Sequence, residues 1–204
     1  MLHRLARLFV IGAAVLLSCS PAYADKFADV LSKGVIRIGI PADLPPFGFQ
    51  NVNREPEGFD IDLAHMLATA LGVKVELIPL TGANRIPYLL TDKVDITVSL
   101  MGLTPQRAKQ VWFSAPYAST SLAVFGPKNL PVHSAADLKN YKVSAAKGNT
   151  EETALTEMNP QADIMRMEND AAAAASFSMR MMSACGFISV NAVSSVFPFA
   201  ALTL

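Results

Sequence analysis

The sequence predicts an α/β protein of two lobes, each built around a parallel β-sheet with helices on both faces. Between residues 35 and 117, short apolar segments alternate with helical ones in the order β-α-β-α-β, and after Tyr117 the alternation starts again. Such alternation with short linkers is typical of parallel sheets. The chain has 204 residues, enough for two small lobes of one composite domain but short for two independent cores.

The composition indicates a folded protein without a nucleic-acid partner. Hydrophobic residues make up 51% of the chain and charged residues 17%, which is too apolar for a disordered protein. Lysine plus arginine equals aspartate plus glutamate at 17 each, so no excess positive charge attracts phosphates. The sequence has no phosphate loop, nucleophile elbow or zinc motif, and we expect no cofactor, no metal and no catalytic role.

Residues 1–24 have the layout of a secretory signal peptide. Arg4 and Arg7 precede an apolar run, Leu8 to Leu17, and a small-x-small motif ends at Ala24. A membrane-spanning helix needs about twenty residues, so the run predicts secretion with cleavage after Ala24 instead of a permanent anchor.

Acylation of Cys19, as in bacterial lipoproteins, is the weaker alternative for this region. Cleavage after Ala24 leaves Cys185 as the one cysteine of the mature chain, so we expect no internal disulfide.

The first lobe begins with a helix, a strand and a loop. The helix starts near Phe27 and ends at Gly34, and the β-branched segment Val35 to Ile40 follows as a strand. Three prolines between Pro41 and Phe49 then predict an irregular loop at the carboxyl end of that strand.

The rest of this lobe continues the alternation. Apolar residues at helical spacing predict a helix from Asp60, its N-cap, to Leu71, with Gly72 as the stop. Further elements are expected as strands over 73–79 and 94–99, a helix over 84–90 and a helix that starts at Thr104.

The second lobe repeats the pattern after Tyr117. Its expected elements are strands over 121–125, 142–146 and 164–167, and helices over 134–138, from 148–150 onward, and from Asp170 as N-cap to Ala175. Ligands of parallel sheets bind beyond the carboxyl ends of the strands, so the loops 41–49 and 99–104 are the expected binding loops.

Arg107 is the first candidate for a ligand contact. It follows Thr104-Pro105, an N-cap and a proline typical of a helix start, and Gly102 upstream lets the backbone approach a ligand. A guanidinium there can hold a carboxylate through two hydrogen bonds, with backbone N–H groups as further donors. Leu100, in the same loop, is a further candidate. A surface arginine in an ordinary salt bridge is the alternative.

Three segments, taken in order, resemble one protein family. They are GFDIDLA at 58–64, VDITVSLMGLTPQRAKQVWFSAPY at 94–117 and KGNT at 147–150. Together they resemble family 3 of the bacterial extracellular solute-binding proteins, which serve ABC importers of polar amino acids, and the match runs from about residue 34 to residue 174.

This resemblance implies a ligand, a site, a partner and a location. Two α/β lobes close over an amino acid, Arg107 holds its α-carboxylate, and the turn at Asn149 and Thr150 supplies a donor from the second lobe. The protein is then a periplasmic monomer that delivers its ligand to an ABC permease.

Several positions bear on the identity of the ligand. Gly102 stands where the family usually has Ser or Thr, so only its backbone can contact a ligand. Leu44 replaces an aromatic residue that some members carry two residues before the Pro46-Phe47 pair. The stretch Asn84-Arg85-Ile86-Pro87 is similar to that of glutamate and aspartate binders, whose arginine faces the side-chain carboxylate. We therefore expect a polar and preferably acidic amino acid, with Arg85 and Phe47 among its contacts.

The chain departs from the family after Ala175. Residues 176–204 contain one charged residue, Arg180, and none of them matches the family's Gly-x-x-Asp-Ala segment, whose aspartate binds the ligand's ammonium. We interpret this apolar tail as an aberrant or truncated terminus that leaves the second lobe and the return to the first lobe incomplete. A buried helix and strand, the strand beginning at Phe187, is the alternative. The expected domains are 1–24, 25–117, 118–175 and 176–204.

Two other functions stay open from the sequence. Some proteins that resemble this family are dehydratases of prephenate-like acids, or wall-degrading enzymes with an extra domain. A dehydratase needs a general acid in its cleft, and no residue of the sequence stands out for that task. A truncated product without function is the other alternative.

Overall fold

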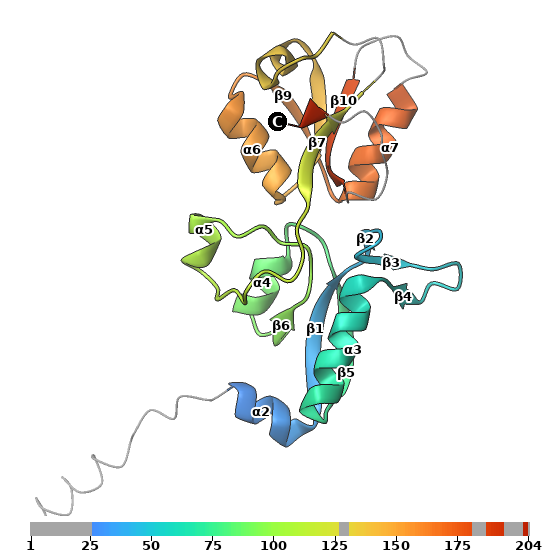
Figure 1. Cartoon of the computed structure of the whole chain (residues 1–204), viewed down its shortest axis with the longest axis vertical. Coiled ribbons are helices and arrows are strands. Elements are labelled where there is room, and N and C mark those ends of the chain that lie inside the picture. Colours follow the sequence, from blue (N-terminus) through green and yellow to red (C-terminus); the bar gives the residue numbers. More distant parts are fainter. Residues whose placement is uncertain (1–25, 127–130, 181–186, 194–201, 204) are drawn as a thin grey trace, which may run out of the picture.

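The structure is a computed structural model that describes residues 26–126, 131–180, 187–193 and 202–203. It has two α/β lobes, which lie one above the other in Figure 1. The predicted signal peptide, including Cys19, lies outside the described residues, as does Cys185. No helix in the described part of the chain is long and apolar enough to cross a membrane.

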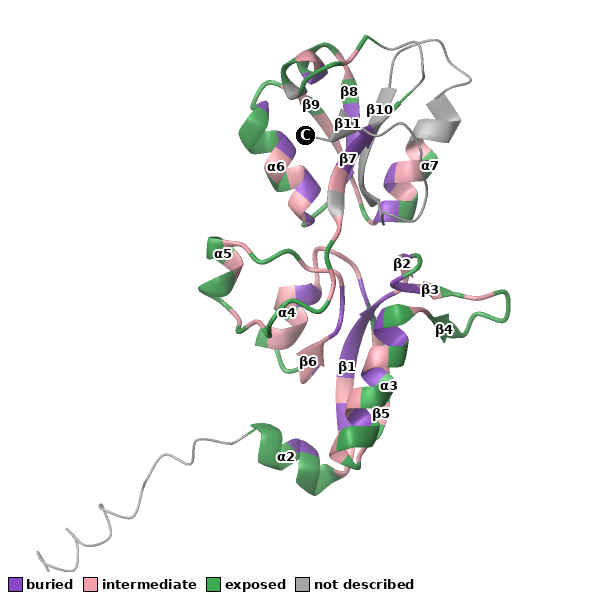
Figure 2. Ribbon diagram, in the orientation of Figure 1, coloured by how far each residue is buried: buried purple, intermediate pink, exposed green. Residues whose placement is uncertain are grey.

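A three-stranded parallel sheet forms the centre of the first lobe. Its strands, in spatial order, are β5 (Lys74–Leu80), β1 (Val35–Pro41) and β6 (Ile96–Thr97). Ile38 of β1 lies between Leu77 and Ile96 of its neighbours and is fully buried. The central strand is therefore the most deeply buried element of the lobe (Figure 2).

Three helices pack against this sheet, namely α2 (Lys26–Lys33), α3 (Phe59–Leu71) and α4 (Arg85–Leu90). A fourth, short helix, α5 (Pro105–Ala108), lies in the segment after β6. Ile61, Ala64 and Ala68 lie at helical spacing on one face of α3 and join the core around β1. Gly72 ends α3 in the left-handed conformation, as the sequence predicts.

The loop after β1 is more regular than the sequence predicts. It forms a small antiparallel sheet of β2 (Asp43–Leu44), β3 (Gly48–Gln50) and β4 (Pro56–Glu57). The prediction of an irregular loop was wrong because Pro45 and Pro46 occupy the turn between β2 and β3, where no ladder hydrogen bond needs their missing N–H.

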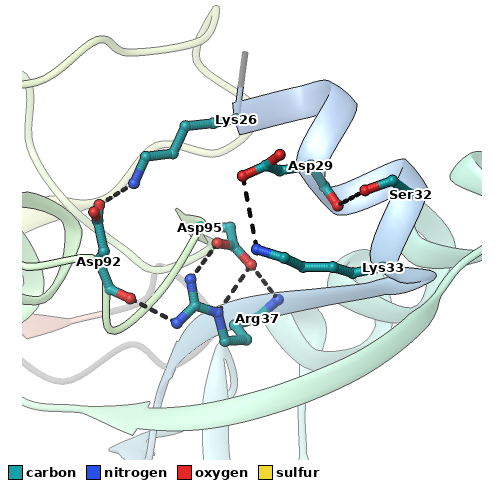
Figure 3. Close-up of polar contacts among 7 residues, drawn as sticks. All are labelled: Lys26, Asp29, Ser32, Lys33, Arg37, Asp92 and Asp95. Atoms are coloured by element: carbon teal, nitrogen blue, oxygen red, sulfur yellow. Dashed lines mark hydrogen bonds and ion pairs between the residues drawn. The ribbon is translucent and has the colours of Figure 1, made fainter. Parts of the chain in front are cut away.

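A cluster of charged side chains ties the start of β1 to the segment before β6 (Figure 3). Asp95 accepts hydrogen bonds from the backbone N–H of Arg37 at 2.8 Å and from its guanidinium. Arg37 also donates to the backbone carbonyl of Asp92 at 2.6 Å, and Lys26 of α2 pairs with the Asp92 carboxylate. The cluster therefore stabilises the amino-terminal ends of these strands, at the end of the sheet far from the second lobe.

The second lobe contains a mixed five-stranded sheet. Its strands, in spatial order, are β11 (Leu202–Thr203), β7 (Ser121–Phe125), β10 (Phe187–Val193), β8 (Lys142–Ala146) and β9 (Asp163–Met167). The three strands β10, β8 and β9 are parallel, whereas β7 runs antiparallel to β10 and β11. The predicted parallel sheet is therefore confirmed for one half of this lobe only.

Two α-helices and a 3₁₀ helix accompany this sheet. They are η1 (Ala135–Asn140), α6 (Thr150–Met158) and α7 (Asp170–Arg180). In Figure 1, α6 and α7 lie on either side of the strands. Leu138, Val143 and Leu155 form the buried core between η1, β8 and α6.

The described part of the apolar tail contributes to the second lobe. Helix α7 continues to Arg180, beyond the predicted limit at residue 175, and β10 pairs with both β7 and β8. Strand β10 begins at Phe187, the residue from which the sequence allowed a strand as the alternative to an aberrant terminus. Residues 181–186, 194–201 and 204 lie outside the described part.

Candidate functional site

A cavity of about 380 Å³, lined by both apolar and charged side chains, lies where the two lobes meet. The first lobe contributes the segment from Ser99 to Leu103, which follows β6, together with Arg85 and Arg107. The second lobe contributes the start of α6 and Asp170 at the start of α7. The cavity therefore lies beyond the carboxyl ends of parallel strands, where the sequence predicts the binding loops.

Arg107 connects the two lobes beside the cavity. Thr104 caps α5 by accepting a hydrogen bond from the Arg107 backbone N–H at 3.2 Å, with Pro105 in the first turn, as predicted. One terminal nitrogen of the guanidinium donates to the Gly102 carbonyl at 2.8 Å, and the other donates to the Gly148 carbonyl at 2.9 Å. Burial lowers the pKa of this guanidinium, but an arginine keeps its charge at neutral pH.

A second series of hydrogen bonds, which begins at Arg85, connects the two lobes. Its Nη1 donates to the Leu100 carbonyl at 3.0 Å and to Oδ1 of Asn149 at 3.2 Å. Nδ2 of Asn149 in turn donates to both carboxylate oxygens of Asp170, at 3.1 and 3.0 Å. Burial lowers the pKa of Arg85 and raises that of Asp170, while the charge of each favours the charged form of the other. Asn149 thus links a buried cation of one lobe to a buried anion of the other.

Small residues allow the lobes to approach closely. A Cβ added at Gly102 would lie 2.8 Å from Cγ2 of Thr150, which belongs to the opposite lobe. Gly148 adopts a φ of 78°, and a Cβ there would lie 2.8 Å from Cα of Ala83. Both positions are therefore restricted to glycine in the closed arrangement.

Unpartnered polar atoms concentrate at this cavity. Among the described residues, four buried side-chain nitrogen or oxygen atoms have no hydrogen-bond partner, and three of them belong to residues that line the cavity. These three are Nε of Arg85, Oγ of Ser99 and Oε2 of Glu151. An unsatisfied buried polar atom costs about 1 to 3 kcal/mol, so such a cluster is typical of a site that a ligand completes.

Glu151 is the carboxylate that sequence reasoning missed. It is 3% exposed, and burial raises the pKa of its carboxyl, while Asp170 acts in the same direction and Arg85 and Arg107 act against it. A buried carboxyl with a raised pKa in a cleft is typical of functional sites. Its burial distinguishes Glu151 from Glu152, and burial cannot be read from two adjacent glutamates in a sequence.

A buried pair lies behind the wall of the cavity. Tyr117 lines the cavity, and its hydroxyl donates to Oδ1 of Asp60 at 3.0 Å. Burial raises the pKa of Asp60 to about 6, and Oδ2 of this carboxyl has no partner. The ring of Phe59 stacks on Tyr117 at a centroid distance of 6.1 Å, and Phe47 meets Phe59 edge-on at 6.3 Å.

The structure brings six of the seven predicted ligand contacts to the cavity lining. They are Arg85, Leu100, Gly102, Arg107, Asn149 and Thr150. Phe47 does not line the cavity, because its ring packs against Phe59 instead. Ser99, Tyr117, Glu151 and Asp170 line the cavity in addition. The described residues contain no group of three or more side chains that could hold a metal ion.

Two α/β lobes with a cavity between them, lined in part by buried charged side chains, define the class of two-lobed binding proteins. The chain belongs to the bacterial extracellular solute-binding proteins, family 3, whose model matches residues 36–177. It is 32% identical over 149 residues to a glutamine-binding protein of Geobacillus stearothermophilus, covering 71% of this chain and 57% of the relative.

Two further relatives bear on the site. The crystal structure of the ancestral amino acid-binding protein AncCDT-1, described as a precursor of cyclohexadienyl dehydratase, superimposes with a TM-score of 0.73 and 37% identity, covering 82% of this chain and 74% of that one. A cyclohexadienyl dehydratase of Pseudomonas aeruginosa is 32% identical over 105 residues, which are 51% of this chain and 39% of the enzyme. The chain spans little more than half the length of the curated binding proteins that it matches.

Proposed function

We propose that the protein binds one amino acid between its lobes and presents it to the permease of an ABC importer. The observation that carries this proposal is the gathering of three unpartnered buried polar atoms at one cavity. Nε of Arg85 can donate a hydrogen bond, Oε2 of Glu151 can accept one, and the hydroxyl of Ser99 can do either. An acid group and an ammonium group on the same small molecule satisfy this set.

Arg107 is the proposed partner of the α-carboxylate. A guanidinium has five N–H groups, and two of the three nitrogens already donate to the carbonyls of Gly102 and Gly148. The remaining N–H groups are free to bind a carboxylate, and Thr150 of the second lobe, which also lines the cavity, would supply a further donor through its hydroxyl or its backbone N–H. Binding would then hold the two lobes together through the ligand.

Arg85 is the proposed contact for the side chain of the ligand. Its Nη1 is already bound to backbone and to Asn149, whereas Nε has no partner. A carboxylate or an amide oxygen can accept that N–H, so the preferred ligands are polar amino acids, with glutamate and aspartate first. We place the protein in the periplasm, since the family to which it belongs is extracellular, and we expect it to act as a monomer.

Titration calorimetry with the twenty common amino acids tests this function. The mature chain should bind a polar amino acid with a Kd in the micromolar range or tighter, and the exposed Trp112 at the cavity offers a second, fluorescent readout of closure. If a chain with the circular dichroism of a folded α/β protein binds none of the twenty, the proposed function is wrong.

A dehydratase is the second candidate function, and Glu151 favours it. A carboxyl whose pKa is raised by burial can hold a proton and donate it to a leaving hydroxyl, which departs as water. The test is turnover of prephenate by the mature chain, followed by absorbance. Turnover that disappears in Glu151→Gln would support the enzyme, whereas no turnover with intact amino-acid binding would exclude it.

A further inference from the structure

Glu151 differs from an ordinary acid in the first turn of a helix. Acidic side chains are favourable at helix N-termini, where they face free backbone N–H groups. Glu152 has this role in α6, since its Oε2 accepts the Gly148 N–H at 2.8 Å and its Oε1 accepts a hydrogen bond from Arg166. Glu151 is more deeply buried than Glu152 and has an oxygen without a partner. The backbone N–H of Glu151 itself favours the ionised carboxylate, but Oε2 has no partner, so this local contact does not satisfy the whole carboxylate.

Asp170, the other carboxylate that lines the cavity, already has hydrogen-bond partners within the protein. Both oxygens of Asp170 accept hydrogen bonds from Asn149, and Arg85 lies on the far side of that amide. Glu151 has no comparable partner for Oε2, although the charges of Arg85 and Arg107 favour its ionised form. Among the described residues that line the cavity, Glu151 is thus the carboxylate that remains available to a cation.

We propose that Glu151 receives the ammonium group of the bound ligand, a role that rests on the proposed function of amino-acid binding. The acid group of the ligand then lies against Arg107 of the first lobe, and its ammonium lies against a carboxylate of the second lobe. A zwitterion therefore bridges the lobes with opposite charges at its two ends. The ligand class is a primary amine that also carries a carboxylate, because a 2-hydroxy acid offers no cation to Glu151.

This assignment has a pH signature. Burial raises the pKa of Glu151, and the groups that act on it are Asp170 of α7, Arg85 of α4 and Arg107 of α5. An ammonium binds the ionised carboxylate, so the affinity for an amino acid should rise with pH as Glu151 loses its proton. The affinity for the corresponding 2-hydroxy acid should not rise in the same range.

The experiment compares amino acids with 2-hydroxy acids of the same side chain. The probes are L-glutamate with L-2-hydroxyglutarate, L-aspartate with L-malate, and L-phenylalanine with L-phenyllactate, titrated into the mature chain, Glu151→Gln and the control Glu157→Gln. Glu157 lies on the same helix and is exposed. Unfolding midpoints of the three proteins show whether each is folded.

The outcomes test the role of Glu151 separately from the proposed function of amino-acid binding. We expect the unchanged chain to prefer an amino acid over its hydroxy partner at least tenfold, and Glu151→Gln to lose that preference because its amino-acid affinity falls tenfold or more. If Glu151→Gln keeps the full preference, the role of Glu151 is refuted while amino-acid binding stands. If the unchanged chain binds none of the twenty common amino acids, titrated in the same way, the proposed function itself fails.

Discussion

Nη1 of Arg85 donates to Oδ1 of Asn149 across the boundary between the lobes, over 3.2 Å, and both side chains are about 5% exposed. Because Nδ2 of the same amide donates to Asp170, one asparagine links a cation of the first lobe to an anion of the second. An amide can do this because it carries both a donor and an acceptor. The closed arrangement of the lobes thus has its own polar bridge beside the cavity, separate from the contacts that a ligand would add.

Replacement of Arg107 by alanine tests the carboxylate site. Arg107→Ala removes the charged donor and its two hydrogen bonds to Gly102 and Gly148. We expect amino-acid affinity to fall by about 2 to 5 kcal/mol, measured by calorimetry, as for other charge-assisted pairs that lose one partner. Lys109→Ala, which removes an exposed cation just after the same helix, is the control and should leave the affinity unchanged.

Asp95 should contribute to stability and not to binding. Asp95→Ala removes the hydrogen bonds to the backbone and the guanidinium of Arg37, in a pair of which Asp95 is the more buried partner. We expect the free energy of unfolding in urea to fall by about 1 to 3 kcal/mol. Asp29→Ala breaks the exposed pair of Asp29 and Lys33. This substitution should change the free energy of unfolding by no more than about 0.5 kcal/mol. Equal effects of the two substitutions would contradict the structural role of Asp95.

Asp60 should make the stability depend on pH. Burial raises its pKa in the folded protein from the ordinary 3.8 to about 6, so between these values the folded chain binds more protons than the unfolded chain. The contribution of Asp60 to stability is therefore full below about pH 4 and is lost as the pH rises through 6. Urea unfolding between pH 4 and pH 8 measures this loss.

The neutral variant Asp60→Asn isolates that contribution. An amide oxygen can still accept the hydrogen bond of Tyr117, but the side chain no longer becomes charged. The stability of Asp60→Asn should consequently exceed that of the unchanged chain above pH 6 and match it more closely near pH 4. Asp62→Asn, on the exposed side of the same helix, should follow the unchanged chain at every pH; a parallel shift in both variants would argue against a special role of Asp60.

The order of helices and strands could be predicted from the sequence. The long-range hydrogen-bond partners of individual side chains could not. Asp60 and Asp170 were both predicted as N-caps from their place before an apolar run. Helix α3 begins one residue before Asp60, with Gly58 at the cap position. At α7, the side chain of Asn169 accepts the Ala172 N–H at 2.8 Å. Each aspartate is thus freed from capping for a partner far away in the chain, and helical periodicity contains no information about such partners.

The candidate site shows the same limit. Arg107 and Gly102 were predictable because a helix start, a proline and a glycine have local signatures, whereas Thr150 was predicted from the resemblance to the family. Glu151 was not, because Glu151 and Glu152 are identical in type and adjacent in sequence, and only the folded structure shows that Glu151 is the buried one. Phe47 has the local features of a binding-loop residue, but its ring packs against Phe59.

Closure of the lobes can be tested at Gly102, where a methyl group would meet Cγ2 of Thr150 at 2.8 Å. Gly102→Ala should weaken ligand binding by about 1 to 3 kcal/mol, because overpacking at this contact opposes the closed arrangement while leaving each lobe intact. Thr150→Ser removes Cγ2 but keeps the hydroxyl, so the double variant Gly102→Ala with Thr150→Ser should recover most of the affinity. Calorimetry on the four proteins measures the coupling, and Trp112 fluorescence reports closure in parallel. Additive losses, with no recovery in the double variant, would show that these two residues do not meet when the ligand binds.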